Sequence, residues 1–170
     1  RIGAVATLSR NFVENFIRPL LHRIDVELVM VSAGLPELLN RLRVHTVDVV
    51  LSNQQVHASS TDPWRCRRIA RQPVSLVGRP RDGAPFRFPD DLADMPLVLP
   101  GRDNDLRAAF DLRCEQFGIR YRLRAEVDDM AMLRLIARDS DCLALLPSVV
   151  VQDELRSGRL VELAVVPDLY

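Results

Sequence analysis

The first fifty residues alternate between two hydrophobic periods. Residues 2–6 form a short apolar run typical of a buried strand, and residues 9–22 then place apolar side chains at helical spacing on one side. Residues 26–31 are rich in β-branched side chains, helical spacing resumes from residues 34–36, and residues 47–51 return to a strand pattern. This strand–helix–strand–helix–strand order predicts a mostly parallel sheet with helices on its faces.

A second unit of the same kind follows a proline-rich middle section. Residues 67–77 have the pattern of an extended strand, and we expect the chain to cross between two lobes at residues 75–80. The later pattern predicts strands at 97–99, 121–127, 142–146 and 160–166, and helices at 104–117, 130–138 and 148–156. The sequence therefore predicts an α/β protein of two lobes, each a mostly parallel sheet flanked by helices.

Composition and charge narrow the function classes. The 170 residues include 23 basic side chains, all of them Arg, and 23 acidic ones, so the formal net charge is zero. Domains that bind nucleic acid usually carry an excess of basic residues on one face. Because the net charge of this chain is zero, we expect it not to bind DNA directly. Three cysteines without paired spacing argue against a disulfide framework and favour a reducing cytoplasm. We see no signal peptide, and no apolar run approaches the ~20 residues that cross a membrane.

Several short motifs, in a fixed order, point to one family. The motifs are Phe16-Ile17-Arg18-Pro19-Leu20-Leu21, Val26-Glu27-Leu28, Gly34, Leu38, Leu42, Val47-Asp48-Val49-Val50 and Ala144-Leu145-Leu146-Pro147. They give a helix with an internal Pro, a Gly before a Leu-rich helix, and an apolar strand that ends in Pro before a helix. In this order the chain resembles the effector domains of LysR-type bacterial transcription regulators over essentially its whole length.

The resemblance implies a two-lobed fold of the type II periplasmic-binding-protein kind, with a small molecule or ion held between the lobes. It assigns residues 1–75 to regulatory subdomain I, completed by residues 165–170 and by residues outside this chain, and residues 76–164 to subdomain II. It also implies a homodimer or tetramer formed through residues 9–31. DNA binding would belong only to a winged helix-turn-helix domain that this chain lacks.

One stretch resembles a particular branch of that family. Residues 99–102 (Leu-Pro-Gly-Arg), with residues 126–129 (Glu-Val-Asp-Asp) downstream, are most similar to the branch that activates a sodium/proton antiporter gene (NhaR-like). Oxygen-rich clusters can hold hard cations, but paired Asp residues equally suit a helix N-terminus. The four carboxylates in question are Asp103, Asp105, Asp128 and Asp129.

Candidate effector contacts follow from the ends of the predicted strands. In open α/β sheets, ligands bind beyond the carboxyl ends of the strands. Free N–H groups at helix starts near Ser9, Asn104 and Ser148 would attract an anion, and Arg102 could add a bidentate fork. The candidate effector-binding residues are Thr7, Ser9, Ser32, Ser52, Asn53, Gly101, Arg102, Asn104, Asp129, Pro147 and Ser148.

Each candidate also has a purely structural explanation. Arg102 suits a solvated loop, by the general preference of Arg for the surface. Ser52 and Asn53 are typical loop residues. Three candidates are good helix N-caps, namely Ser9, Asn104 and Asp129. Capping does not exclude ligand contact, so both explanations stand at this point.

The sequence carries no recognisable catalytic or cofactor motif. It lacks a Gly-Lys-Ser/Thr phosphate loop, a G-x-S-x-G elbow and a G-x-G-x-x-G fingerprint. Its three histidines do not have the spacing of a zinc helix. Cys114 and Cys142 are expected to be buried and inert, whereas Cys66 lies between two arginines and is the one candidate redox sensor. We expect no enzyme activity, no metal and no cofactor.

Two functions fit these observations. The first is a sensory module of a transcription regulator that binds a small effector and relays it to a DNA-binding domain. The alternative is a solute-binding protein of a transport system with the same architecture, which would need a secretion signal. An enzyme on this architecture would need a nucleophile or an acid–base pair in the cleft. The residues upstream of Arg1 would discriminate between the first two.

Overall fold

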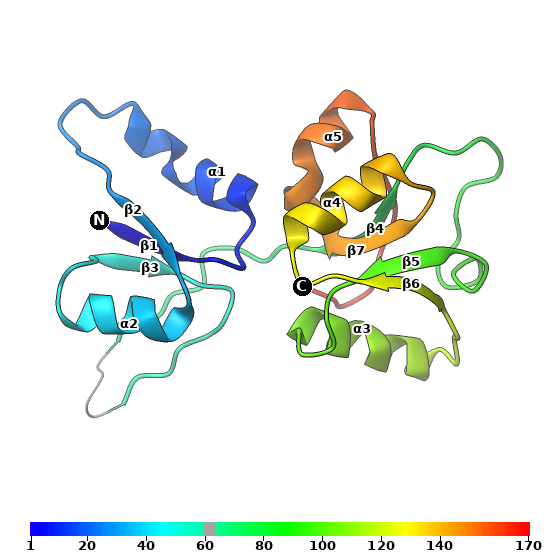
Figure 1. The fold of residues 1–170 in the computed structure, drawn as a ribbon, viewed down its shortest axis with the longest axis horizontal. Helices are drawn as coiled ribbons and strands as arrows, with labels where there is room; N and C mark the ends of the chain where they lie inside the picture. The colour runs from blue at the N-terminus through cyan, green and yellow to red at the C-terminus, as the bar shows by residue number, and fades with distance from the viewer. Residues whose placement is uncertain (60–63) are drawn as a thin grey trace. The chain divides into compact units, whose positions relative to one another are not determined.

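The strands of the chain lie in two separate sheets (Figure 1). The computed structural model describes residues 1–59 and 64–170, which divide into two compact units, Arg1–Ala70 and Arg71–Tyr170. Each unit combines one sheet with its own helices, as the alternating sequence pattern predicted. In the described ranges, no helix is long and apolar enough to cross a membrane.

Unit 1 is a three-stranded sheet in the order β2–β1–β3, with all strands parallel. The strands are β1 (Ile2–Val5), β2 (Met30–Ala33) and β3 (Val49–Leu51), and the helices are α1 (Arg10–Leu21) and α2 (Leu35–Arg43). The two helices lie on opposite sides of this sheet (Figure 1). This is the parallel sheet with flanking helices that the first fifty residues predicted.

Side chains along β1 alternate between the two faces of the sheet. Ile2 and Ala4 are buried with Leu51 on the face that α1 covers. Gly3 faces α2, and a Cβ atom at its position would lie 2.8 Å from the Leu38 Cδ2 atom. Glycine in this strand therefore lets α2 pack close to the sheet.

Unit 2 is a five-stranded mixed sheet in the order β6–β5–β7–β4–β8. Its strands are β4 (Val74–Gly78), β5 (Pro96–Leu99), β6 (Arg122–Glu126), β7 (Leu143–Pro147) and β8 (Val161–Val165). Strands β5, β6 and β7 are parallel, and β4 is antiparallel to both of its neighbours, β7 and β8. Its helices are α3 (Asp105–Gln116), α4 (Met130–Asp139), the 3₁₀ turn η1 (Ser148–Val151) and α5 (Gln152–Ser157).

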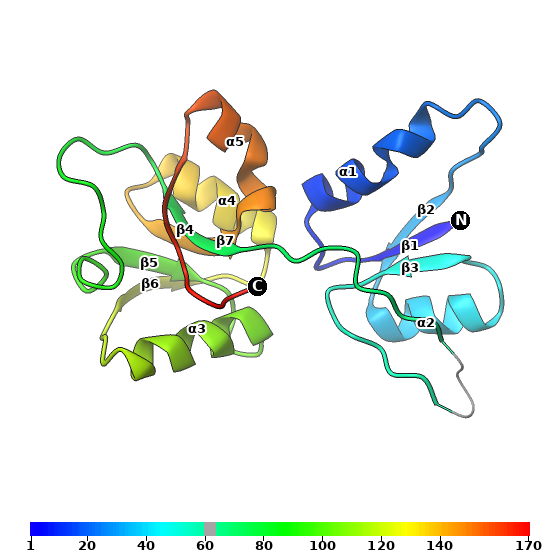
Figure 2. The same cartoon turned by 180° about the vertical axis from the view of Figure 1, so that it is seen from behind.

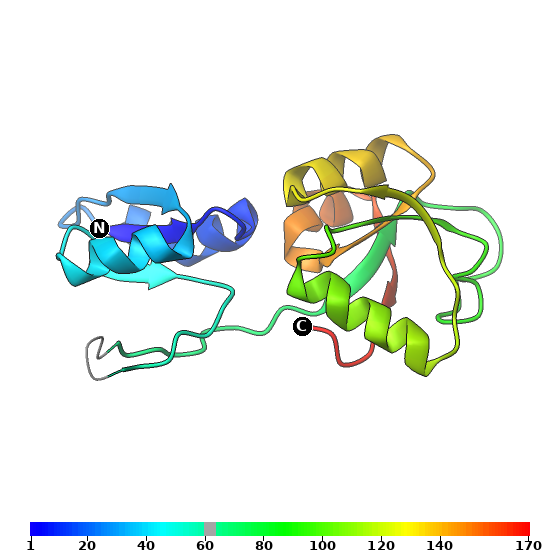
Figure 3. The ribbon, with the colours of Figure 1, turned by 60° about the horizontal axis from the view of Figure 1, so that its bottom comes forward.

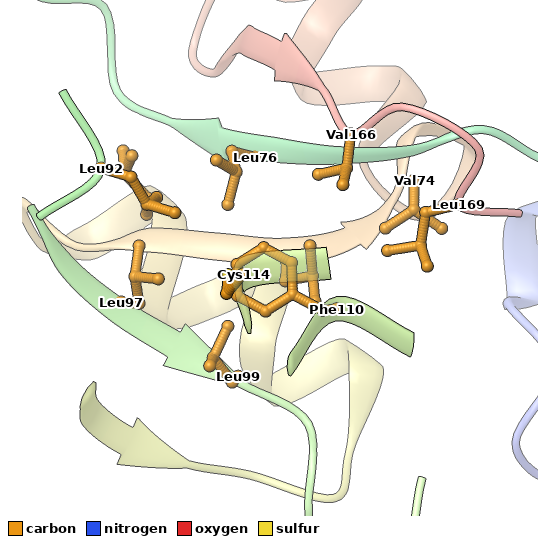
Figure 4. Close-up of a cluster of buried hydrophobic side chains, with 11 residues drawn as sticks. Val74, Leu76, Leu92, Leu97, Leu99, Phe110, Cys114, Val166 and Leu169 are labelled. Carbon is orange, nitrogen blue, oxygen red and sulfur yellow. The ribbon is translucent and has the colours of Figure 1, made fainter. Parts of the chain in front are cut away.

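The two faces of the unit 2 sheet carry separate hydrophobic cores. Figure 3 shows α3 on one face and α4 with α5 on the other. Phe110 and Cys114 of α3 pack with Leu97 and Leu99 (Figure 4), whereas Val98 between them belongs to the cluster on the α4 face. All five side chains are at most 2% exposed. The alternation along β5 thus builds both cores, and Cys114 is buried as expected.

Two strands of unit 1 are shorter than their apolar runs predicted. A strand extends only where a neighbouring strand pairs with it. The register sets Ile2 opposite both Met30 and Val49. The strands expected at 26–31 and 47–51 therefore begin at residues 30 and 49.

Two elements of unit 2 also differ from the prediction. The extended run expected at 67–77 becomes a strand only from Val74, which lies opposite Pro147, the last residue of β7. The helix expected at 148–156 begins as the 3₁₀ turn η1 before α5 follows. This second change alters the chemistry expected at Ser148.

The last residues of the chain pack within unit 2 (Figure 2). The Val166 N–H donates to the Val74 carbonyl at 2.9 Å, and the Val74 N–H donates to the Leu169 carbonyl at 3.2 Å. Val166 and Leu169 are buried in the core under α3. The family resemblance led us to expect residues 165–170 in the first lobe, but here their apolar side chains complete the second core. The unit boundary also falls after Ala70 instead of after residue 75.

Candidate functional site

The carboxyl ends of the unit 1 strands bring three of the predicted polar residues together. Thr7 follows β1 and Asn53 follows β3, and these strands are parallel neighbours. The Thr7 Oγ1 hydroxyl donates to Asn53 Oδ1 at 3.5 Å, and both side chains are exposed. Ser52, the residue before Asn53, accepts a hydrogen bond from the Gln54 N–H at 2.9 Å. This edge therefore offers hydroxyl and amide groups that both donate and accept hydrogen bonds.

Ser9 lies at the same edge and caps α1. Its Oγ accepts a hydrogen bond from the Phe12 N–H at 3.4 Å, and its backbone is extended. The capping explanation from the sequence is confirmed. Ser9 is only half-buried, so its hydroxyl still reaches the surface of this edge.

Ser32 is placed differently from the expectation. The sequence put it beyond the end of the second strand, but it is the third residue of β2, paired with Ala4. The observed strand lies further along the sequence than predicted and ends at Ala33. Ser32 is exposed on this edge strand and does not follow the strand as the other candidates do.

Two candidates of unit 2 cap the helices that follow β5 and β6. The Asn104 Oδ1 accepts from the Leu106 N–H at 2.9 Å, and the Asp129 Oδ1 accepts from the Ala131 N–H at 2.8 Å. Both caps confirm the structural explanation. Each cap uses one of the free N–H groups that would otherwise be offered to an anion.

Gly101 lies directly under a carboxylate. A Cβ atom at this position would meet the Asp128 Oδ1 atom at 1.9 Å. Arg102, the next residue, is 78% exposed in its side chain, and its guanidinium Nε lies 3.7 Å from Glu126 Oε2. Its backbone N–H also donates to Glu126 Oε1, at 3.3 Å. Arg102 is thus a solvated loop residue with an acidic neighbour, as its structural explanation predicted.

The acidic group suggested by the sequence does not assemble into a cation site. Among the residues that the structure describes, no three His, Cys, Asp or Glu side chains are grouped so that they could hold a metal ion. Asp129 is occupied as an N-cap, and Asp128 turns toward Gly101. The carboxylates at this edge therefore make separate local contacts and do not share one site.

Ser148 belongs to a polar cluster that the sequence did not reveal. Its hydroxyl donates to the Glu162 carboxylate, which also accepts from the Ser75 hydroxyl at 2.9 Å. The two serine oxygens are 3.0 Å apart, and Ser75 is fully buried. The helix start expected here is a 3₁₀ turn, and the Ser148 N–H already donates to the Pro73 carbonyl at 3.4 Å. Ser148 therefore presents a hydroxyl and a nearby carboxylate, and not the open helix N-terminus that we expected.

A buried arginine holds the loop that carries Gly101. Arg107 is 3% exposed and donates to both carboxylate oxygens of Asp111, at 2.9 and 3.0 Å. Its other nitrogens donate to the Pro100 carbonyl at 3.2 Å and the Tyr121 hydroxyl at 2.9 Å. Burial and the hydrogen bond from Tyr121 to Asp111 raise the pKa of the Tyr121 hydroxyl. The i, i+4 spacing of Arg107 and Asp111 was the sequence signal for this cluster.

Each sheet thus gathers its candidates at one edge. Strands β5, β6 and β7 are parallel, so the residues that follow them share an edge in unit 2. Those residues are Gly101, Arg102, Asn104, Asp129, Pro147 and Ser148. In unit 1 the corresponding residues are Thr7, Ser9, Ser52 and Asn53. The polar edges offer hydrogen-bonding groups of the kind that fix the orientation of a small ligand.

Comparison with known proteins gives one family over the whole chain. The LysR substrate binding domain family matches residues 1–170. A comparison with curated protein sequences finds no match.

Solved structures of similar fold carry the same family name or are described as regulatory domains. VV2_1132, a LysR family transcriptional regulator, is 18% identical with a TM-score of 0.70, and the match covers 95% of this chain and 56% of that protein. The regulatory domain of HypT from Salmonella typhimurium is 15% identical with a TM-score of 0.69, covering 99% and 79%. The regulatory domain of CcmR from Synechocystis PCC6803, in complex with 2-PG, is 13% identical with a TM-score of 0.67, covering 96% and 78%. At these identities the likeness supports the shared fold, and the chain spans little more than half the length of VV2_1132.

Proposed function

The chain belongs to the LysR substrate-binding domain family, and from that premise we propose that it is the effector-sensing domain of a bacterial LysR-type transcription regulator. The family match over residues 1–170 carries the proposal. A chain with no net charge suits a sensing domain better than a DNA-binding one. DNA binding would then be the task of another domain of the full protein.

We propose that the two polar sheet edges make the effector contacts. In unit 1 these are the exposed groups of Thr7, Ser9 and Asn53. In unit 2 they are the groups around Gly101 and Ser148. The caps and the Ser148–Glu162 hydrogen bond already use several donors, so an effector must accept from the remaining donors and donate to the carboxylates. A small polar molecule that does both fits these edges better than a simple anion.

A finer proposal concerns the branch of the family. We propose the NhaR-like branch on the basis of residues 99–102 and 126–129, which lie against each other where the Asp128 carboxylate covers Gly101 and where Arg102 contacts Glu126. Since the described residues hold no grouped metal ligands, this proposal does not include a preformed cation site. A reporter assay with the full-length protein tests it. A transcriptional response to sodium or pH is expected, and a response to an organic acid with none to sodium or pH would contradict it.

We also propose that the protein acts as a homodimer or tetramer through residues 9–31. No residue of α1 is fully buried within this chain. Leu21, Ile24 and Val29 are large apolar side chains that are more than 40% exposed. Large apolar side chains exposed in this way suit a subunit interface. The three cysteines are free, which suits a regulator that works in the reducing cytoplasm.

The transport alternative shares the fold but is less favoured by the family match. A solute-binding protein would hold its ligand at comparable strand ends, so the fold alone does not separate the two functions. The residues upstream of Arg1 in the complete gene would separate them. A helix-turn-helix there supports the regulator, and a secretion signal supports the transport protein.

The effector site is tested most simply by thermal unfolding of the chain against a library of metabolites and salts. A ligand that binds only the folded state raises the unfolding temperature. We expect at least one small polar compound to do so, and we expect Asn53→Ala and Ser148→Ala to weaken its effect. Gln54→Ala, next to Asn53, and Ser157→Ala, at the end of α5, are controls at exposed positions outside the proposed site. Equal ligand responses in all four variants would contradict the proposed site.

A further inference from the structure

Unit 2 has an open pocket of about 560 Å³ away from the effector edge. Its lining residues are Arg79, Pro80, Arg138, Asp139 and Arg159. Arg79 follows β4, and β4 runs antiparallel to β7, so the pocket lies beside the amino end of β7. Arg138 and Asp139 end α4, the helix that precedes β7. Gly101 and Ser148 follow the carboxyl ends of their strands and therefore lie at the opposite edge of the sheet.

The three arginines of this pocket differ in how far they are already paired. Arg138 holds both oxygens of Asp139, at 2.8 and 2.7 Å. Arg79 has a long contact, 3.9 Å, with the highly exposed Asp141, and, after the hydrogen bonds from Arg138, its charge also helps to lower the pKa of the Asp139 carboxyl. Within the described part of the chain, Arg159 makes no ion pair and its side chain no hydrogen bond. Two guanidinium groups are therefore free to bind a ligand.

The pocket is electrostatically positive after its acidic neighbours are counted. Three Arg and Asp139 line it, and Asp141 lies beside Arg79, which leaves a charge of +1. The carboxyl end of α4 contributes about half a unit of negative charge. The nearby pair of Arg134 and buried Glu154, joined at 2.7 Å, is neutral as a whole. A surplus of positive charge remains on three different segments of the chain.

We propose that this arginine pocket (Arg79, Arg138 and Arg159) binds a phosphate group, either free phosphate or the phosphate of a phosphorylated metabolite. A guanidinium fork matches the geometry of phosphate oxygens and donates two hydrogen bonds at once. A carboxylate has two oxygens in one plane and is satisfied by a single fork, as Asp139 is by Arg138. A phosphate monoester has three terminal oxygens and free phosphate has four, and they face different directions, which suits donors from Arg79, from Arg159 and from the Nη1 group of Arg138 that Asp139 does not use. The pocket volume is also that of small-ligand sites.

The site is independent of the proposed effector site because the two lie at opposite edges of the unit 2 sheet. A phosphate bound there gives this unit a second ligand. The experiment must therefore distinguish phosphate binding here from binding at the effector edge. The arginines of the pocket can be substituted without disturbing the hydrophobic core.

NMR of the arginine Nε–H groups in the full chain tests the proposal directly. Inorganic phosphate is titrated at constant ionic strength, set with sodium chloride, and glucose 6-phosphate is titrated in parallel with glucose as its control. We expect saturable shifts of the Arg79 and Arg159 signals. Arg159→Gln and Arg79→Gln should each weaken the affinity at least tenfold. Arg124→Gln, on the exposed far edge strand β6, should leave the affinity unchanged.

The comparison of ligands identifies the source of the phosphate. A sugar phosphate that binds at least fivefold more tightly than inorganic phosphate supports a phosphorylated metabolite, and equal affinities support free phosphate. Shifts that do not saturate, or equal weakening by Arg124→Gln and Arg159→Gln, would overturn the proposal. Loss of binding in Ser148→Ala, with none in Arg159→Gln, would move the phosphate to the effector edge and also overturn it.

Discussion

The start of the loop after β5 is held by the buried side chain of Arg107. Arg107 lies on α3 but donates to the Pro100 carbonyl, one residue before Gly101. Its other hydrogen bonds join Asp111 and Tyr121, and its ring contact with Tyr121 is 5.7 Å from guanidinium carbon to centroid. Arg107 also lies 3.5 Å from Glu126 of β6, so one charged group joins the helix, the loop and β6 and supports the proposed effector edge from behind.

Replacing Arg107 by Met tests this support. The variant removes the Arg107 donor from the Pro100 carbonyl and from the Asp111 carboxylate, which keeps only the Tyr121 hydroxyl. Asp111 is 37% exposed, so water offsets part of the loss. We expect a fall of about 2 kcal/mol or more in the free energy of unfolding, measured by urea denaturation. Arg113→Met, on the same helix, breaks an exposed pair with Asp168 and should cost less than ~1 kcal/mol. Equal losses in the two variants would show that Arg107 has no special structural role.

Ionisation of the Cys114 thiol should lower the stability of the fold at alkaline pH. Burial, the largest contribution, together with the Asp111 charge raises the pKa of this thiol from 9.0 to about 11. A raised pKa favours the folded state while the thiol is protonated. That contribution is complete below pH 9, and it is lost as the pH rises from 9 to 11.

Unfolding titrations between pH 8 and 11 check this expectation. A two-unit shift corresponds to roughly 3 kcal/mol across the window. Cys114→Ala should be less stable at pH 8 because of the cavity it leaves, but its stability should fall less steeply above pH 9. A slope identical to that of the unchanged protein would refute the assignment to Cys114.

At the scale of elements, local sequence signals predicted the helix caps correctly, whereas the pairing of strands was not predicted correctly. Ser9 and Asn104 cap their helices because capping depends only on residues two or three positions away. The strand expected at 26–31 was misplaced because its start depends on Ile2, far away in the chain. The cluster of Ser75 and Ser148 needs three strands brought together by the antiparallel β4, which no local pattern reveals. The polar edges were predicted from strand order, whereas their internal hydrogen bonds were not.

The cap of α3 offers a prediction at this scale. Asn104→Ala removes the acceptor of the Leu106 N–H and should cost about 1 kcal/mol in unfolding free energy. Asn104→Gly should cost only a few tenths, because a Gly N-cap leaves the first turn open to water. If Asn104 also touches the effector, both variants should weaken ligand-induced stabilisation alike. Two variants of equal stability would show that the side-chain cap contributes nothing.

At the scale of the whole molecule, several large apolar side chains within residues 9–31 remain exposed. Leu21 is 61% exposed, and Ile24 is fully exposed in the turn between α1 and β2. Such side chains gain from burial against another subunit, at roughly 25 cal/mol per Å² of apolar area. The proposed oligomer accounts for this surface.

Sedimentation equilibrium tests the oligomer. Leu21→Asp combined with Ile24→Asp places two charges on the proposed interface and should shift the chain toward the monomer by at least tenfold in dissociation constant. Leu112→Asp, an equally exposed site on α3 of unit 2, is the control and should leave the mass unchanged. A double variant that associates like the unchanged protein would exclude residues 9–31 as the interface.

We propose that this chain senses a small effector for a LysR-type regulator. The decisive measurement starts from one compound that raises the unfolding temperature of the chain. The same compound is then tested in a transcription reporter assay with the full-length protein. We predict that the compound changes reporter output, and that Asn53→Ala with Ser148→Ala abolishes both the stabilisation and the response while Gln54→Ala preserves both. A compound that stabilises the chain through these residues and leaves transcription unchanged at saturating concentration would contradict the claim.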